Sequence, residues 1–286
     1  MLDIFKKTDV LLEALPYIQR FRSSIFVVKY GGSFMDSPDP KVRAGVASDI
    51  VFLEAVGINP IVVHGGGKAI TAAMERTGIK AQFVQGMRVT DERSMDIVED
   101  VLGNIINRDI VEMVQKIGGK ARSISGKEVF KCRKLMKDGI DLGYVGEVTE
   151  VMVERVRKCL HTQVTPVISP IGLGDDGHAY NINADVAAAK LAVAIGARRL
   201  VFMSDVPGLM RDPSNAETLI SSLKASEAMD LKHQGIVDKG MIPKVDSAVE
   251  AVQAGVRRVH LVDGRVPHSI LLEIFTDKGS GTEIVK

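Results

Sequence analysis

Two short stretches decide the fold of this 286-residue chain: residues 24–32 read SIFVVKYGG, and residues 60–67 read PIVVHGGG. Each is a run of apolar, mostly β-branched residues that stops at glycines, which is the pattern of a short buried strand. Apolar residues at helical spacing fill positions 40–57 between them. Because strands here alternate with a helix, the stretch favours a parallel sheet covered by helices.

The same alternation continues to the end of the chain. We predict further strands at 163–169, 179–183, 200–203 and 259–262, and further helices at 68–77, 91–117, 152–160, 184–195, 244–254 and 268–275. Residues 121–150 predict hairpins at the edge of the sheet. The predicted fold is therefore α/β, with an open, mainly parallel central sheet sandwiched by helices.

An extension helix precedes the first strand, and Pro16 is expected to kink or divide it. We divide the chain into an N-terminal helix (1–22), an N-lobe (23–175) and a C-lobe (176–286).

Composition excludes several classes of function. Lys and Arg number 37 against 36 Asp and Glu, so the net charge of +1 gives no electrostatic footprint for nucleic acid. Apolar runs are too short to span a membrane. Two cysteines cannot build a disulfide framework, which fits a reducing cytoplasm. No His, Cys or Asp spacing predicts a metal site.

The glycines at the two strand ends predict a ligand site. In an open parallel sheet, ligands bind beyond the carboxyl ends of the strands, and glycine lets backbone N–H groups approach an anion. A turn explains one Gly-Gly pair, but two such strand ends favour an anion site. Lys29 lies in an apolar strand, so its ammonium group either passes the strand end into solvent or meets a phosphate. Neither stretch matches the known phosphate-loop or dinucleotide motifs.

Seven motifs then follow in order: KYGG (29–32), VHGGGK (63–68), GMRVTD (86–91), NINADVAAAKLA (181–192), SDVPGL (204–209), GMIPKVDSAVEA (240–251) and DGRVPHSILLEIFTDKGSGT (263–282). From about residue 24 to its end, the chain resembles the amino acid kinase family, in particular its arginine-inhibited branch. The resemblance implies ATP-dependent phosphorylation of the side-chain carboxylate of N-acetyl-L-glutamate, a step of arginine biosynthesis. It also implies Mg²⁺, carried by the nucleotide phosphates.

The resemblance assigns roles to individual residues. Lys29 and Lys244 would contact the transferred phosphoryl group from two sides, and Asp185 would hold both ammonium groups. The substrate would be bound by Gly66, Gly67, Arg88 and Asn181. The nucleotide would be bound by Gly31, Gly32, Gly65, Ser204, Asp205, Gly208 and Met241. A carboxylate is already ionised at neutral pH, so the reaction needs no general base.

The resemblance also implies regulation. His260, Glu273 and Gly279 would line an arginine pocket beside the N-terminal helix, and that helix would link dimers into a hexamer. Two other functions stay open. One is phosphorylation of an aminoadipate derivative in lysine biosynthesis, and the other is a non-catalytic regulator that binds nucleotide or arginine and acts through partners such as a PII signalling protein.

Overall fold

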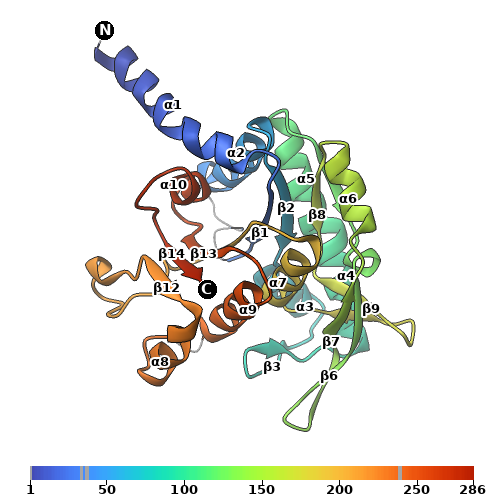
Figure 1. Cartoon of the computed structure of the whole chain (residues 1–286). Helices are drawn as coiled ribbons and strands as arrows, with labels where there is room; N and C mark the ends of the chain where they lie inside the picture. The colour runs from blue at the N-terminus through green and yellow to red at the C-terminus, as the bar shows by residue number, and fades with distance from the viewer. Residues whose placement is uncertain (1, 33–34, 36–38, 238–239) are drawn as a thin grey trace.

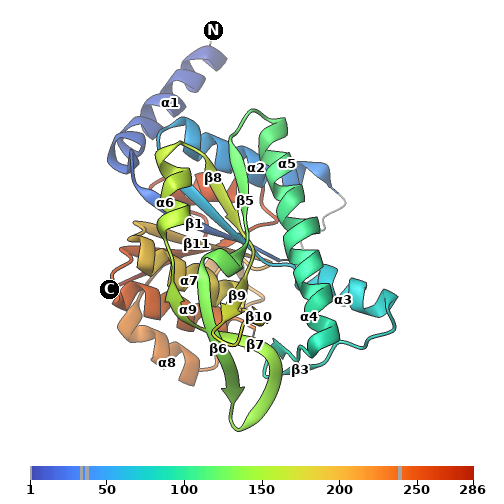
Figure 2. The ribbon, with the colours of Figure 1, turned by 90° about the vertical axis from the view of Figure 1, so that its right-hand side faces the viewer.

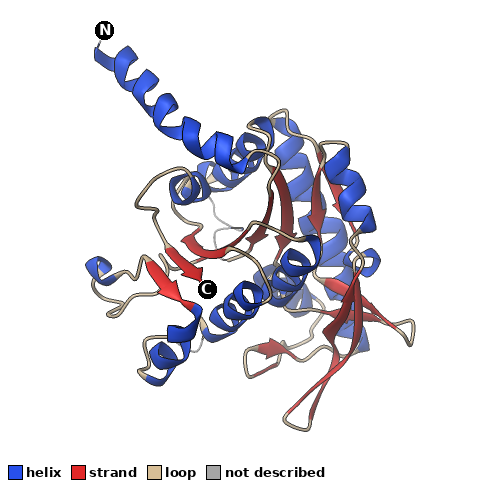
Figure 3. Ribbon diagram, in the orientation of Figure 1, coloured by secondary structure: helices blue, strands red, loops and turns tan. Residues whose placement is uncertain are grey.

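A computed structural model describes residues 2–32, 35, 39–237 and 240–286. At its centre lies a sheet with the strand order β12-β14-β13-β11-β1-β2-β8-β5 (Figure 3). Every neighbouring pair is parallel except β13 and β14, which are antiparallel. In chain order the strands are β1 (Ile25–Tyr30), β2 (Asn59–His64), β5 (Ala121–Ile124), β8 (Thr165–Ile168), β11 (Arg199–Ser204), β12 (Ser222–Lys224), β13 (Arg258–Asp263) and β14 (Thr282–Val285).

Helices cover both faces of this sheet, as the views in Figures 1 and 2 show. Because successive side chains of a strand point to opposite faces, neighbours such as Val27 and Val28 enter different cores. Helices α6 (Glu154–His161), α7 (Ala184–Ile195) and α9 (Ile242–Gln253) pack on the face of Val27. Helices α2 (Pro40–Ala55), α5 (Asn107–Lys116) and α10 (Ser269–Ile274) pack on the face of Val28. The predicted α/β architecture is confirmed.

The segment predicted as edge hairpins divides into two parts. Only β5 lies at the edge of the central sheet. The long hairpin of β6 (Phe130–Lys137) and β7 (Ile140–Val151) instead forms a small closed barrel with β9 (Ile171–Gly174) and β10 (Ala179–Asn181). The edge prediction was wrong for this hairpin because its buried side chains, among them Phe130 and Cys132, pack into the core that contains α7.

Further elements complete the first half of the chain. Strands β3 (Phe83–Val84) and β4 (Met87–Arg88) form a two-stranded hairpin. The predicted helix 91–117 consists of α4 (Glu92–Asp100), a π-helical segment (Val101–Ile106) and α5. The remaining helices are α1 (Leu2–Phe21), α3 (Gly67–Arg76) and α8 (Ala228–His233). No helix of the described residues is both long and apolar enough to cross a membrane.

Helix α1 is continuous from Leu2 to Phe21, so the expectation that Pro16 divides it was wrong. A proline removes one backbone hydrogen bond, which a helix of this length survives. Near its end, Phe21 and Tyr17 pack edge-on against Phe275, with ring centroids 6.4 Å apart in both pairs. The opposite end of the helix extends away from the body (Figure 1).

The sheet brings the two glycine stretches together. Strands β1 and β2 are parallel neighbours, and Tyr30 lies opposite His64. The Gly65 N–H donates to the Tyr30 carbonyl at 2.8 Å, which joins the two strand ends. His64 is fully buried between a backbone oxygen of Gly65 (2.9 Å) and the Asn107 amide (3.1 Å), and burial lowers its pKa to about 4. The histidine is therefore a neutral support for the turn.

Candidate active site

Three charged side chains from different parts of the chain meet at the carboxyl end of β1. Lys29 Nζ lies 3.0 Å from Asp185 Oδ1, and Lys244 Nζ lies 2.8 Å from Asp185 Oδ2. Asn183 caps α7 through the N–H groups of Asp185 and Val186, which fixes the carboxylate in the first turn of the helix. Lys244 comes from the first turn of α9. The structure thus brings these three predicted residues together.

The environment of this triad is dry. Lys29 is 7% exposed and Asp185 is 5% exposed. Burial lowers the pKa of Lys29, and the Asp185 carboxylate offsets part of this effect. Burial alone would raise the pKa of Asp185, but the charges of Lys29 and Lys244 outweigh it and hold that pKa below its ordinary value. One buried carboxylate thus keeps two ammonium groups close together, which is an arrangement suited to binding an anion between them.

Glycine makes room for neighbouring side chains at two positions of this site. A Cβ on Gly31 would lie 2.6 Å from Lys29 Nζ, so a side chain there would displace the ammonium group. A Cβ on Gly66 would lie 2.5 Å from Ile106 Cδ1 and 2.6 Å from a Leu102 methyl. Glycine therefore lets the lysine bend past the strand end and lets the loop rest on the π-helical segment.

A cleft of about 460 Å³ opens beside the triad. Its walls come from the two glycine loops, the β3–β4 hairpin, the β6–β7 hairpin and the start of α7. The predicted residues that line it are Lys29, Gly31, Gly32, Gly65, Gly66, Gly67, Arg88, Asn181 and Asp185. The structure therefore brings all four predicted substrate residues to the same cleft as two of the predicted catalytic residues.

Arg88 enters this cleft from β4 in a fixed position. Its Nη2 donates to the Gly67 carbonyl at 2.7 Å and to Thr71 Oγ1 at 2.8 Å. Its guanidinium carbon lies 4.8 Å from the centre of the Phe83 ring. Burial lowers the pKa of Arg88, yet a guanidinium group stays charged at any physiological pH. Asn181 also lines the cleft, and its Nδ2 donates to Thr90 Oγ1 at 3.3 Å.

Four predicted nucleotide residues do not line this cleft. Ser204 is buried and donates to the Val206 carbonyl at 3.3 Å. A Cβ on Gly208 would lie 2.5 Å from Thr282 Oγ1, so packing explains this glycine. Met241 is buried in the core at the start of α9.

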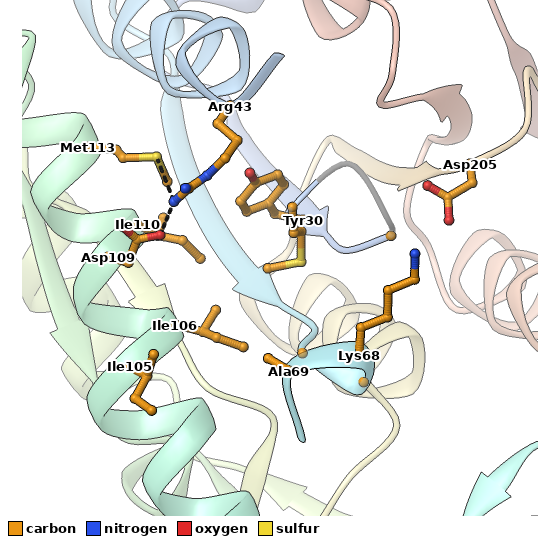
Figure 4. Close-up of a pocket in the computed structure, with 14 residues that line it drawn as sticks. Tyr30, Arg43, Lys68, Ala69, Ile105, Ile106, Asp109, Ile110, Met113 and Asp205 are labelled. Carbon is orange, nitrogen blue, oxygen red and sulfur yellow. Dashed lines mark hydrogen bonds and ion pairs between the residues drawn. The ribbon is translucent and has the colours of Figure 1, made fainter. Parts of the chain in front are cut away.

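Asp205, the fourth of these residues, lines a second pocket of about 640 Å³, together with Gly32 and Lys68. In Figure 4, Lys68 extends from the start of α3 toward the side on which Asp205 lies. The Arg43–Asp109 ion pair forms the far wall of this pocket.

The predicted arginine residues form a separate pocket of about 380 Å³ on the α1 side of the molecule. His260 Nδ1 donates to Glu273 Oε1 at 2.7 Å, and Glu273 Oε2 accepts from the N–H groups of Ser280 (2.7 Å) and Gly281 (2.8 Å). Burial alone would raise the pKa of Glu273, but these bonds hold it below its ordinary value. Gly279 has a φ of +63°, and a Cβ there would lie 2.6 Å from Glu273 Oε2.

The N-terminal helix contributes to this pocket, as expected. Tyr17, Arg20 and Phe21 line it together with His260 and Glu273.

The relationship of the chain to known proteins agrees with this geometry. The sequence pattern of the amino acid kinase family matches residues 24–263. The chain belongs to the amino acid kinase family. The resemblance seen in the motifs is thereby confirmed. Within the family, the acetylglutamate kinase of Syntrophomonas wolfei is 49% identical over 281 residues, which cover 98% of this chain and 97% of that enzyme.

Solved structures support the same fold. N-acetylglutamate synthase from Neisseria gonorrhoeae, complexed with coenzyme A and N-acetyl-glutamate, matches with a TM-score of 0.87 at 27% identity. The match covers 98% of this chain and 63% of the synthase, so this kinase-family chain spans less than two thirds of the synthase. The synthase complexed with coenzyme A and L-arginine matches with a TM-score of 0.83 at 27% identity, covering 98% of this chain and 65% of that one.

The sequence did not reveal the β6–β7 side of the cleft. Leu135, Lys137 and Glu147 line it, although no residue of the 120–145 segment was assigned a role. Nothing in the sequence indicated which face of the hairpin meets the cleft, because the strand pairing is irregular around Leu135.

Proposed function

We propose that this chain transfers the γ-phosphoryl group of ATP to the side-chain carboxylate of N-acetyl-L-glutamate, giving N-acetyl-L-glutamyl 5-phosphate and ADP. The observation that carries the proposal is the pair of ammonium groups held on one buried carboxylate at the edge of a cleft that also contains Arg88. The full-length similarity to acetylglutamate kinases supports this substrate.

The step itself balances without a general base. A carboxylate oxygen of the substrate attacks the γ-phosphorus, and the bond to the β–γ bridging oxygen breaks as ADP leaves. The substrate carboxylate and the γ-phosphate are both anions, and negative charge shifts across the phosphoryl group during its transfer. Cations held in fixed positions around that group therefore make the largest contribution to lowering the barrier. Lys29 and Lys244 supply this charge from two sides, and Asp185 keeps their ammonium groups at fixed positions.

The substrate would bind with its α-carboxylate near Arg88. The amide nitrogen of Asn181 is bonded to Thr90, which leaves its oxygen to accept the N–H of the acetylamino group. Backbone N–H groups of the two glycine loops would receive phosphate and carboxylate oxygens. Ser204, Asp205, Gly208 and Met241 remain our prediction for the segments that border the nucleotide.

Mg²⁺ would enter with ATP. Within the described part of the chain, no three His, Cys, Asp or Glu side chains are grouped closely enough to hold a metal ion. Nucleotide oxygens and water would therefore supply its ligands, as is usual for this ion. The ion would neutralise phosphate charge, while this chain's own residues position the reacting groups.

The direct test is ATP-dependent formation of an acyl phosphate, trapped as a hydroxamate with hydroxylamine. We expect the hydroxamate with N-acetyl-L-glutamate, and a much lower kcat/KM with the N-acetyl-aminoadipate homologue. Activity with the homologue alone would replace this substrate with the lysine-pathway alternative. No turnover of either compound would favour the non-catalytic regulator.

We further propose that L-arginine inhibits the enzyme by binding the pocket of His260 and Glu273. Glu273 is a natural partner for a guanidinium group. Arg199 and Arg258 line the same pocket and would attract the α-carboxylate. Arginine, but not citrulline, should reduce hydroxamate formation, because citrulline lacks the positive charge. Glu273→Gln should raise the half-inhibitory arginine concentration at least about ten-fold while leaving kcat near wild type.

We also propose an assembly built from dimers, in which α1 links three dimers into a hexamer. The support is the exposure of Leu12 (60%) and Leu15 (43%) on a helix that extends away from the body. The assignment of 1–22, 23–175 and 176–286 as linker helix, substrate lobe and nucleotide lobe belongs to this proposal, as does a cytoplasmic location. Light scattering tests the assembly, and a binding titration with a PII protein tests that partner.

A further inference from the structure

Two hairpins line the substrate side of the cleft and are hydrogen-bonded to each other. Just after β4, the Thr90 N–H donates to the Leu142 carbonyl at 3.0 Å, and the Thr90 carbonyl accepts from Tyr144 N–H at 2.6 Å. At their tips, Gln85 Nε2 donates to Asp138 Oδ2 at 2.7 Å. Both contacts lie near the turn of the β6–β7 hairpin, so they fix this end of it, which includes Lys137, beside the β3–β4 hairpin.

Lys137 lies beside Asp138 at the end of β6 and lines the cleft together with Leu135. The pairing of β6 with β7 is irregular between Lys134 and Met136, and both Leu135 and Lys137 reach the cleft there. Met136 between them is 55% exposed. Lys137 and Arg88 thus belong to two walls of the same cleft, one on each hairpin.

Lys137 differs from the other cations of the β6–β7 hairpin in its ion pairing. Each of its three other cations has an acidic partner on β7: Lys131 with Glu150 at 2.6 Å, Arg133 with Glu147 at 2.7 Å, and Lys134 with Asp141 at 2.7 Å. Within the described residues, no acidic side chain forms such a pair with Lys137. Glu147, the acidic residue of this hairpin that lines the cleft, is paired with Arg133, and Asp138, next to Lys137 in the chain, accepts from Gln85.

Arg88 alone has limited capacity for a carboxylate. A guanidinium group has five N–H donors. Two of the Arg88 bonds go to Gly67 and Thr71 through Nη2, and Nη1 lies 3.3 Å from Met74 Sδ. Much of the donor set thus serves to fix Arg88 in place. A carboxylate in the cleft could therefore accept hydrogen bonds from a second donor in addition to the N–H groups of Arg88 that remain unused.

We propose that Lys137 is a specificity residue that binds the α-carboxylate of the acyl-amino acid from the β6–β7 hairpin, while Arg88 binds it from β4. The inference rests on the proposed kinase function and names one more contact of its substrate site. Lys137 would favour substrates that carry a second carboxylate besides the reacting one. It has no part in the phosphoryl step, which belongs to Lys29, Lys244 and Asp185.

The test compares two substrates on Lys137→Met and wild type. One is N-acetyl-L-glutamate, and the other is its α-amide, which keeps the reacting side-chain carboxylate but loses the α-carboxylate charge. Both are measured by ATP-dependent hydroxamate formation. The variant should raise the KM for the diacid about ten-fold or more, as expected when a charge-assisted contact is removed, with kcat and the KM for ATP nearly unchanged. For the α-amide, wild type and variant should have equal kcat/KM.

Two controls make the result specific. Lys134→Met removes a cation of the same hairpin that pairs with Asp141 and does not line the cleft, so its KM values should match those of wild type. Lys137→Arg keeps the charge and should keep most of the affinity for the diacid. Equal losses for acid and amide, or no loss for the acid in an active enzyme, would overturn the Lys137 assignment alone. A wild-type enzyme inactive on both compounds would overturn the proposed function and this assignment with it.

Discussion

Replacing Asp185 with Asn tests whether one carboxylate holds the active-site cations. The change keeps the shape of the side chain but removes the charge that faces Lys29 at 3.0 Å and Lys244 at 2.8 Å. Since the Lys29 and Asp185 side chains are only 9% and 7% exposed, water cannot compensate. Breaking a buried ion pair on one side costs about 3–5 kcal/mol, so we expect a loss of this size in the free energy of unfolding at about pH 7.

The loss should depend on pH in a defined direction. Burial already lowers the pKa of Lys29, and removing Asp185 lowers it further. A lysine whose folded pKa lies below its unfolded value destabilises the fold most at low pH, and the penalty fades as pH rises through the folded pKa. The difference between wild type and Asp185→Asn should therefore shrink between about pH 7 and pH 10.

Urea unfolding followed by far-UV circular dichroism measures both effects. Glu250→Gln is the matched control, because it removes a carboxylate that pairs with Lys190 on the protein surface, where it is 59% exposed. An exposed pair contributes about 0–1 kcal/mol. If Asp185→Asn were no less stable than Glu250→Gln, or if its deficit were the same at both pH values, the triad would not be the buried charge cluster described above.

Two further predictions follow from other parts of the molecule. A variant lacking residues 1–20 should form dimers in light scattering, because the helix that links the dimers is gone. It also lacks Tyr17 and Arg20 of the arginine pocket, so a higher arginine concentration should be needed for half-inhibition. A hexamer with unchanged inhibition would contradict this. Burial raises the pKa of Asp49 from 3.8 to about 6, although the His268 bond opposes this shift. Between these two pH values the folded state binds the Asp49 proton more tightly than the unfolded state does. The stability contributed by Asp49 therefore falls as pH rises from 3.8 to about 6. Urea unfolding of Asp49→Asn should show a pH dependence flatter than wild type by about 3 kcal/mol across the window, and parallel curves would refute the shift.

Much of the fold was predictable because its deciding strands are short and apolar and end in glycines. Strands β1 and β2 are buried on both faces, so continuous apolar runs identified them, and the parallel arrangement then placed their glycines side by side. The grouping of Lys29, Asp185 and Lys244 was implied by the resemblance to the family, and the structure places each of them where a strand ends or a helix begins.

Other parts depended on contacts that no local pattern encodes. The β6–β7 hairpin reads as edge strands, yet long-range pairing with β9 and β10 makes it part of a separate barrel. Lys137 was missed for the same reason, because its position at the cleft depends on the Gln85–Asp138 contact between residues 53 positions apart. Pro16 does not divide the N-terminal helix as predicted, since one lost hydrogen bond does not end a helix of 20 residues.

The central claim is that Lys29 and Lys244 lower the barrier of phosphoryl transfer rather than merely bind substrate. The most direct test is the single-turnover rate constant for hydroxamate formation with ATP and N-acetyl-L-glutamate both saturating, compared among wild type, Lys29→Met and Lys244→Ala. A group that acts on the transition state contributes about 10²–10³-fold, so each variant should be slower by that factor with KM values changed far less. Wild-type rate constants in both variants, with only KM raised, would contradict the claim.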